Sequence, residues 1–198
     1  MDFIATTLLL FIVLDPLGNI PIYLSQLQAV PEPRRRRVAL RELGIAYLVL
    51  LFFFFAGSAF MKLLSLDIAS VNIAGAVILF LIAIRMVFPS QDGLFGNTPT
   101  GKAPLIVPLA IPAVAGPGAL SVVLLLREAN PGQSMTLLAA LTAAWLISAV
   151  ILGAAPHLQR ILRDEGILAV ERLMGLVLLI IAIQMFLDAL RLIGAING

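Results

Sequence analysis

Residues 15–21 read Asp15-Pro16-Leu17-Gly18-Asn19-Ile20-Pro21, and they interrupt a segment that otherwise has the composition of a transmembrane helix. A second interruption, Pro112-Ala113-Val114-Ala115-Gly116-Pro117-Gly118, follows roughly one hundred residues later. In hydrocarbon every backbone N–H and C=O needs a partner, so a broken helix is tolerated only where it lines a cavity or is buried in protein. Paired breaks in corresponding halves of a chain are the best sequence indication of a transporter's substrate site.

The composition indicates a membrane protein. Of the 198 residues, 61% are hydrophobic and only 12% are charged, and the mean hydropathy is +1.09. A soluble globule of this size needs far more polar surface. A membrane-spanning helix needs about 20 mostly apolar residues. The sequence therefore predicts an all-α integral membrane protein with six transmembrane helices, at about residues 3–28, 43–64, 68–88, 103–126, 134–156 and 168–190.

The basic residues predict the topology, because short cytoplasmic loops carry an excess of Lys and Arg. Placing the arginine-rich segment after the first span in the cytoplasm puts ten basic residues on that side: Arg34, Arg35, Arg36, Arg37, Arg41, Arg85, Lys102, Arg160, Arg163 and Arg172. Only Lys62, Arg127 and Arg191 remain outside, and both termini are then outside as well. Topology and the lipid bilayer account for the arginine run, so no nucleic-acid partner is expected.

An internal repeat is visible when the sequence is shifted by 99 residues. Ile82-Ala83-Ile84-Arg85-Met86 then aligns with Ile181-Ala182-Ile183-Gln184-Met185. Each copy holds three predicted spans, and an odd number inserts the second copy upside down. We expect one transmembrane domain, residues 1–198, made of repeat 1 (about 1–88), a polar linker (89–102) and an inverted repeat 2 (about 103–198).

The breaks in predicted helices 1 and 4 align less cleanly than the third and sixth spans. A shift of 101 pairs Asp15-Pro16 with Gly116-Pro117, and a shift of 96 pairs Pro16 with Pro112. We prefer the first shift because it lies nearer 99. With either shift, both interruptions fall near mid-membrane.

Asp15 is the residue whose place in a membrane most needs explaining. It follows Phe3–Leu14, which carries no charge, and an aspartate at the centre of a spanning helix costs roughly 2.5–3.5 kcal/mol. Asp15 could carry a proton or pair with a substrate ammonium group. It could instead cap a half-helix that has Pro16 at its first position. The two interpretations are compatible, and both stay open at this stage.

The other residues of the breaks suit a binding site built from backbone. Gly18 and Asn19 let the chain unwind, and Pro21 prevents a regular turn before it. A helix beginning near Gly116 would aim free N–H groups at an anionic group. The predicted substrate-binding residues are Asp15, Pro16, Gly18, Asn19, Pro21, Pro112, Gly116, Pro117 and Gly118, with Asp15 also the candidate for proton coupling. A packing kink is the alternative, but a kink usually needs one proline alone.

No cofactor or metal is expected. The chain has no cysteine, and its single histidine, His157, cannot form a metal site without further ligands. Glu171, which the shift of 99 aligns with Asn72, is expected to pair with a nearby arginine.

Leu14–Ile22 and Ile111–Gly118 closely resemble the two signature stretches of the MarC family of bacterial inner-membrane proteins. Glu171–Leu176 is also similar to that family, particularly to its YhgN-like branch, and the resemblance covers essentially the whole chain. It implies a six-span protein of the bacterial inner membrane, which with the charge pattern gives periplasmic termini. Family members are assigned to neutral amino acid transport, with glycine and alanine as typical substrates and the proton gradient as the energy source.

The leading hypothesis is a secondary active transporter of small neutral amino acids, working as an importer or an exporter, and not an enzyme. The substrate carboxylate would meet backbone N–H groups at Gly116–Gly118, and its amine would lie near Asp15 and Asn19. A passive channel for small solutes and a membrane-embedded lipid-modifying enzyme are the alternatives. The sequence shows neither a ring of charged pore residues nor arginines near the breaks, which these alternatives would need.

Overall fold

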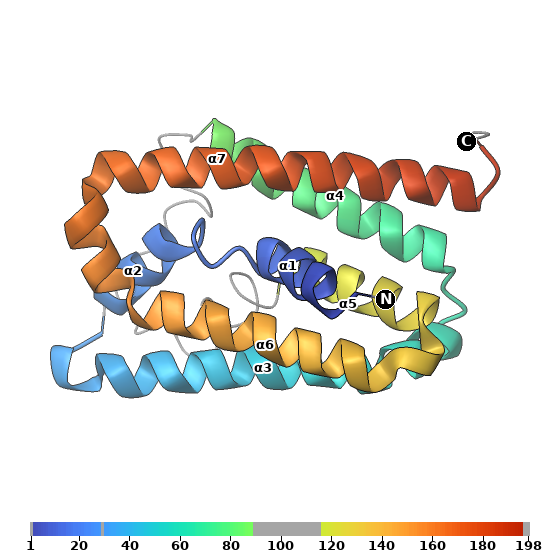
Figure 1. Ribbon diagram of the computed structural model, residues 1–198, viewed down its shortest axis with the longest axis horizontal. Helices are drawn as coiled ribbons and strands as arrows, with labels where there is room; N and C mark the ends of the chain where they lie inside the picture. Colours follow the sequence, from blue (N-terminus) through green and yellow to red (C-terminus); the bar gives the residue numbers. More distant parts are fainter. Residues whose placement is uncertain (1, 29, 89–115, 196–198) are drawn as a thin grey trace.

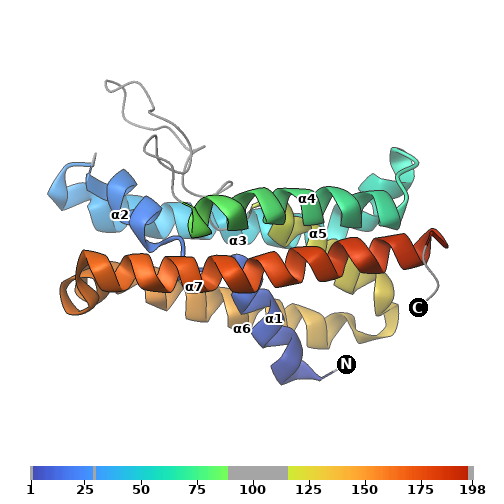
Figure 2. The same cartoon turned by 90° about the horizontal axis from the view of Figure 1, so that it is seen from above.

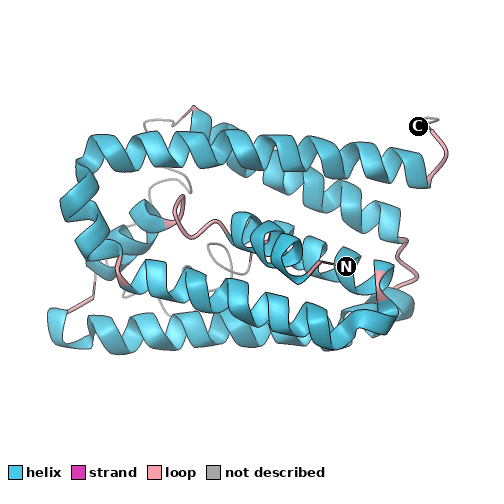
Figure 3. Ribbon diagram, viewed as in Figure 1, coloured by secondary structure: helices cyan, strands magenta, loops and turns pink. Residues whose placement is uncertain are grey.

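The first predicted span is interrupted, as expected. The computed structural model describes residues 2–28, 30–88 and 116–195, and every regular element in these ranges is a helix. Two helices, α1 (Phe3–Leu14) and α2 (Ile20–Gln28), are joined by a turn that Figure 3 draws as a loop. Neither has the roughly 20 residues that a spanning helix needs, so neither half is long enough to cross a membrane alone.

The next two helices are α3 (Glu32–Leu63) and α4 (Ile68–Val87). The boundaries of α4 match the prediction, but α3 begins well before residue 43. The arginine-rich segment is therefore part of a helix and not a loop. Arginine is a good helix former, and Pro33 and Glu32 suit the first turn of a helix.

The second half of the chain contains α5 (Pro117–Ala129), the short 3₁₀ helix η2 (Pro131–Gln133), α6 (Ser134–Gly153) and α7 (Ala155–Leu192). α7 starts earlier than predicted because it includes a segment before a kink at Arg163, where φ is 54°. Figure 1 shows the chain changing direction there. The predicted linker and the first part of the predicted fourth span lie outside the described residues.

Within the described ranges, four helical segments are long and apolar enough to cross a membrane: Glu32–Leu63, Ile68–Val87, Pro131–Gly153 and Glu165–Leu192. α1 is a shorter apolar helix. Large apolar side chains such as Leu48, Phe52 and Phe55 on α3 are exposed on the outside of the bundle. An outer surface of this kind is stable in lipid and not in water.

The long helices surround the two short ones. In Figure 1, α1 and α5 lie between the α4–α7 pair and the α3–α6 pair, and Figure 2 shows the same bundle from above. α4 packs along α7 and α5, α1 packs against α6, and α3 packs against α5. The break after α1 is thus inside the bundle and not on its lipid-facing surface.

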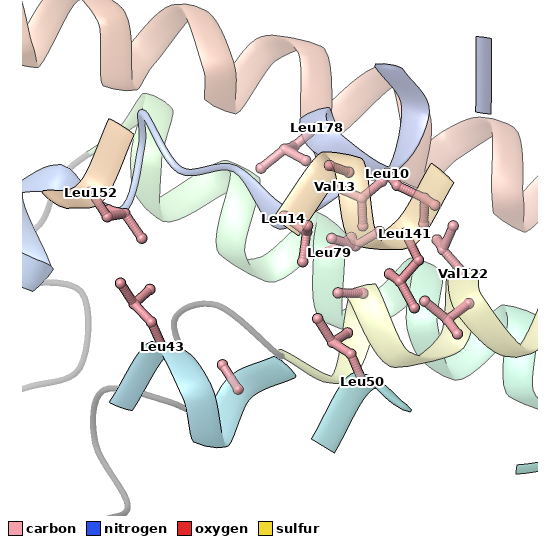
Figure 4. Packing of buried hydrophobic residues seen from close by; sticks show 14 of the residues in the cluster. Leu10, Val13, Leu14, Leu43, Leu50, Leu79, Val122, Leu141, Leu152 and Leu178 are labelled. Atoms are coloured by element: carbon pink, nitrogen blue, oxygen red, sulfur yellow. The ribbon is translucent and has the colours of Figure 1, made fainter. Parts of the chain in front are cut away.

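The core is formed by aliphatic side chains from all these helices except the short η2. Figure 4 shows the residues that point toward one another at its centre. They are Leu10, Val13, Leu14, Leu43, Leu50, Leu79, Val122, Leu141, Leu152 and Leu178. α1 contributes three of the labelled residues, so the broken helix is anchored in the core up to the residue before Asp15.

α4 and α7 approach each other through two glycines. A Cβ atom added to Gly75 of α4 would overlap Ser121 of α5 and would lie 3.3 Å from Met185 Cε of α7. A Cβ atom added to Gly175 of α7 would lie 2.8 Å from Met86 Cβ of α4. The pairs 75–185 and 86–175 require the two helices to run antiparallel. Small residues allow this close approach between helices in a membrane.

The Gly175→Leu variant is expected to unfold at a lower temperature than the wild type. The added side chain would meet Met86 and the Ala83 carbonyl oxygen, and overpacking of this kind costs about 1–3 kcal/mol. Thermal unfolding in detergent, followed by the loss of helical circular dichroism, measures the effect. Gly44→Leu is the matched control, because a Cβ atom at Gly44 meets nothing within 4 Å. Equal unfolding temperatures for the two variants would contradict the close contact at Gly175.

Candidate functional site

The break between α1 and α2 is a hydrogen-bonded turn centred on Asp15. Asp15 has left-handed backbone angles, φ 43° and ψ 58°, and its N–H donates to the carbonyl oxygens of Phe11 and Ile12. Its own carbonyl oxygen accepts from Asn19 N–H at 3.1 Å. Asp15 therefore ends α1 and at the same time begins the turn that leads into α2.

The Asp15 side chain is buried, with 4% of its surface exposed. Oδ1 accepts a hydrogen bond from Gly18 N–H at 3.1 Å. The expectation that Asp15 caps a helix starting at Pro16 is wrong about the element, because Asp15 is the C-cap of α1 and α2 begins only at Ile20. The carboxylate caps the intervening turn. The second oxygen, Oδ2, accepts no hydrogen bond within the described part of the chain.

Asn19 supplies the donors that the broken helix lacks. Its Nδ2 donates to the carbonyl oxygen of Asp15 at 2.9 Å and to that of Leu14 at 3.2 Å. In a continuous helix these carbonyls would accept from the N–H groups of Gly18 and Asn19. The Asp15 carbonyl keeps its bond from Asn19 N–H, but Gly18 N–H is bonded to Asp15 Oδ1 instead, so the Leu14 carbonyl depends on Asn19 Nδ2. The asparagine side chain thus stabilises the unwound backbone, as the sequence predicts.

Gly18 is needed because there is no room for a side chain. A Cβ atom at this position would overlap Asp15 Oδ2 and Met86 Cε. The absence of a side chain lets the carboxylate fold back over the turn. Pro16 is buried in the same turn, and Pro21 lies in the first turn of α2.

The second predicted arm is described only from Gly116 onward, and Pro112 lies outside the described residues. Gly116 is the N-cap of α5 and Pro117 its first residue, so a helix does begin where the sequence predicts. No side chain caps this end, and the N–H groups of Gly118 and Ala119 are the first-turn donors that a helix start leaves without helical partners. A Cβ atom at Gly118 would overlap Leu79.

The two arms contact the same helix but not the same point on it. Gly18 packs on Met86 of α4 and Gly118 on Leu79. Seven residues correspond to about 10 Å along a helix, so a small molecule would have to lie along α4 to reach both arms.

Glu171 is a second buried carboxylate near the break, with 7% of its surface exposed. Its charge acts on Asp15, and it lies one helical turn before Gly175, whose backbone packs on Met86. Arg172 is the nearby arginine whose charge acts on Glu171, but the two form no salt bridge within the described residues. One sequence feature hints at its importance: it aligns with Asn72, which is also buried and whose amide atoms have no hydrogen-bond partner in the described part of the chain.

A cavity of about 920 Å³ lies elsewhere, between α2, α3, α6 and the start of α7. Tyr23 and Leu24 of α2 line it, but no residue from 15 to 21 does. No pattern in the sequence predicts this cavity. Within the described ranges, no three His, Cys, Asp or Glu side chains are grouped closely enough to hold a metal ion.

These features define a multi-pass, all-helical integral membrane protein with a discontinuous first helix and a buried carboxylate at the discontinuity. The family model described as "MarC family integral membrane protein" matches residues 1–193. The chain therefore belongs to the MarC family.

Relatives cover nearly the whole chain. The UPF0056 inner membrane protein YhgN of Escherichia coli (strain K12) is 47% identical over 191 residues, which is 96% of this chain and 97% of that protein. A UPF0056 membrane protein of Buchnera aphidicola subsp. Schizaphis graminum is 42% identical over 190 residues, or 96% of each chain. One from Chlamydia muridarum is 30% identical over 186 residues, 93% of this chain and 90% of that protein. These names support an inner-membrane location and mention no substrate. No solved structure matches the chain.

Proposed function

We propose that the protein is a secondary active transporter of small neutral amino acids such as glycine and alanine, driven by the proton gradient. The observation that carries the proposal is the buried Asp15 carboxylate. One of its oxygens holds the turn through Gly18 N–H, and the other accepts no hydrogen bond within the described residues. Such an oxygen can accept a substrate ammonium group or a proton. An ionisable side chain inside a membrane is a functional candidate by default.

The start of α5 suits the other end of a zwitterion. Its first N–H groups have no side-chain cap, and the N-terminal end of a helix dipole favours an anion. A substrate carboxylate at Gly118 and an ammonium group at Asp15 would use both arms. This arrangement favours a zwitterion over a simple ion, and transport of it needs no chemical step and no cofactor.

An inverted repeat is part of the proposal. Gly75 of α4 lies against Met185 of α7, and Gly175 of α7 lies against Met86 of α4. Each helix therefore contributes one glycine and one methionine to the pair of contacts. A two-fold relation between two elements produces reciprocal contacts of this kind, and the shift of 100 from residue 75 to 175 lies within one residue of the sequence repeat of 99. Rocking of one repeat against the other would alternate access to the site.

The proposed orientation follows from the basic residues. Figure 1 places the start of α3 and the start of α7 at one end of the bundle, and the C-terminal ends of both helices at the other. Arg34–Arg37 and Arg160 are thereby separated from Lys62 and Arg191. By the positive-inside rule the first end is cytoplasmic and both termini are periplasmic.

Flux of glycine and alanine into proteoliposomes tests the function. Uptake of labelled substrate is expected to saturate with concentration and to increase when a pH gradient is imposed. Flux that does not saturate and ignores the gradient would indicate a passive channel. No flux of any small neutral amino acid in either direction would reject the proposed substrate class.

A further inference from the structure

The 920 Å³ cavity combines a charged end with apolar walls. Four arginines line it: Arg35 and Arg36 from the first turns of α3, and Arg160 and Arg163 from the start of α7. None of the four forms an ion pair within the described part of the chain. In the described residues, the one side-chain hydrogen bond that any of them makes is donated by Arg35 Nε to the carbonyl oxygen of Val30, at 3.0 Å. Four guanidinium groups around one cavity, with no carboxylate among its described lining residues, favour an anionic occupant.

The rest of the lining is mostly apolar, and several of its side chains are exposed on the surface of the bundle. Leu40 of α3 and Leu146 and Val150 of α6 line the cavity and are 62%, 51% and 71% exposed. Apolar side chains with such exposure, in a chain of this composition, face the hydrocarbon of the bilayer. This exposed apolar side of the cavity, formed by α3 and α6, is therefore suited to an acyl chain and unsuited to a soluble ion.

The wall opposite α2 is held in place by contacts between α3 and α6. Trp145 Nε1 donates to the carbonyl oxygen of Leu43 at 3.2 Å, and the Trp145 ring stacks on Tyr47 with centroids 4.5 Å apart. The Tyr47 hydroxyl is in turn hydrogen-bonded to Thr142 Oγ1 at 2.7 Å. The parts of α3 and α6 that line the cavity are thus held in place before any ligand binds, which reduces the entropic cost of binding.

We propose that this cavity binds one anionic phospholipid, with its phosphate at the arginines and an acyl chain leaving between α3 and α6. The size agrees, because pockets for small molecules range over about 300–1,000 Å³, and a free amino acid would leave most of this volume empty. Basic pockets between transmembrane helices bind acidic lipid headgroups in the same way. The lipid would also touch Tyr23, Leu24 and Leu27 of α2, the half-helix that follows the break.

Native mass spectrometry of the purified full-length protein tests the proposal. The protein is titrated with phosphatidylglycerol and, separately, with phosphatidylethanolamine that carries the same acyl chains. Phosphatidylglycerol is expected to bind in a one-to-one complex and at least about tenfold more tightly. Equal binding of the two lipids would overturn the proposal. Glycerol phosphate, which has the anionic group without acyl chains, is expected not to compete; full competition would mean a site for a soluble anion.

Two variants with the same change of charge locate the site. Arg36→Gln/Arg160→Gln removes two lining arginines and is expected to weaken phosphatidylglycerol binding at least about tenfold. Arg34→Gln/Arg37→Gln alters two exposed arginines at the start of α3 that do not line the cavity, and it is expected to bind like the wild type. Equal losses in the two variants would show general attraction to a basic surface and would overturn the proposed site.

Gly44→Leu tests the apolar part without changing charge. Gly44 lines the cavity, and a Cβ atom there meets nothing within 4 Å. Leucine also favours a helix more than glycine does, so the variant is expected to fold. Its side chain would occupy the space of the acyl chain and reduce one-to-one lipid binding at least about tenfold. Unchanged binding in this folded variant would contradict the proposed path of the chain.

Discussion

The Asp15→Asn variant is expected to bind glycine or alanine about ten- to a hundredfold more weakly than the wild type and to lose its response to a pH gradient. Asparagine keeps an oxygen that can accept the Gly18 N–H bond, but it has no charge for an ammonium group and no proton to exchange. A hydrogen bond to a charged group contributes about 1.5–3 kcal/mol, and each 1.4 kcal/mol is a factor of ten in affinity. Concentration-dependent uptake by proteoliposomes, with and without a pH gradient, measures both effects.

Two further variants separate the roles of this carboxylate. Asp188→Asn makes the same chemical change at an exposed site, where the carboxylate bonds Arg191 and Gln184, and wild-type uptake is expected. Asp15→Ala also removes the oxygen that bonds Gly18 N–H, so it is expected to lose about 1 kcal/mol of stability that Asp15→Asn retains. If Asp15→Asn keeps gradient-driven uptake at the wild-type level, the carboxylate only holds the turn.

The break itself could be predicted from sequence because its causes are local. Pro16 has no N–H to donate, Gly18 has no side chain, and Asn19 can bond carbonyls of the preceding turn. All three act within five residues of Asp15. The same holds for the start of α5, where Gly116 and Pro117 are favourable first residues of a helix. Which element Asp15 caps was not predictable, because that depends on the left-handed backbone angles it adopts.

The start of α3 was misjudged because the prediction counted apolar residues. Arg34–Arg37 lower the hydropathy of the segment and do not lower its helix propensity. A membrane helix can therefore extend into the interface beyond its apolar part. The extension matters for function, because it carries Arg35 and Arg36 to the cavity.

The cavity and the place of Glu171 depend on contacts between distant parts of the chain. Arg36 and Arg160 are more than one hundred residues apart and come together only when α3 and α7 start at the same end of the bundle. Glu171 reaches the neighbourhood of Asp15 because α7 packs on α4 through Gly175. Neither of these proximities leaves a local pattern in the sequence. The positive-inside rule, moreover, already explains why the arginines are there.

Replacing Asn19 by alanine is expected to lower the free energy of unfolding by about 1–3 kcal/mol and to abolish uptake. The change removes the Nδ2 donor from the carbonyl oxygens of Leu14 and Asp15. The Asp15 carbonyl still accepts from the backbone N–H of residue 19, so the Leu14 carbonyl is the one left unsatisfied, and an unsatisfied buried polar group costs about 1–3 kcal/mol. Water cannot replace the donor within a membrane. Thermal unfolding in detergent and uptake by proteoliposomes measure the two effects.

Asn130→Ala is the matched control for Asn19→Ala. Asn130 also donates through Nδ2 to a backbone carbonyl, that of Leu126 at 3.1 Å, but it lies at the end of α5 beside the exposed residues of η2. Water can take over that bond, so a loss of no more than about 1 kcal/mol is expected. Asn19→Asp keeps the shape without the donor and should be at least as damaging as Asn19→Ala. A stable Asn19→Asp protein would mean that the turn persists without these two bonds, and the unwound backbone would then be held by the packing of α1 and α2 instead.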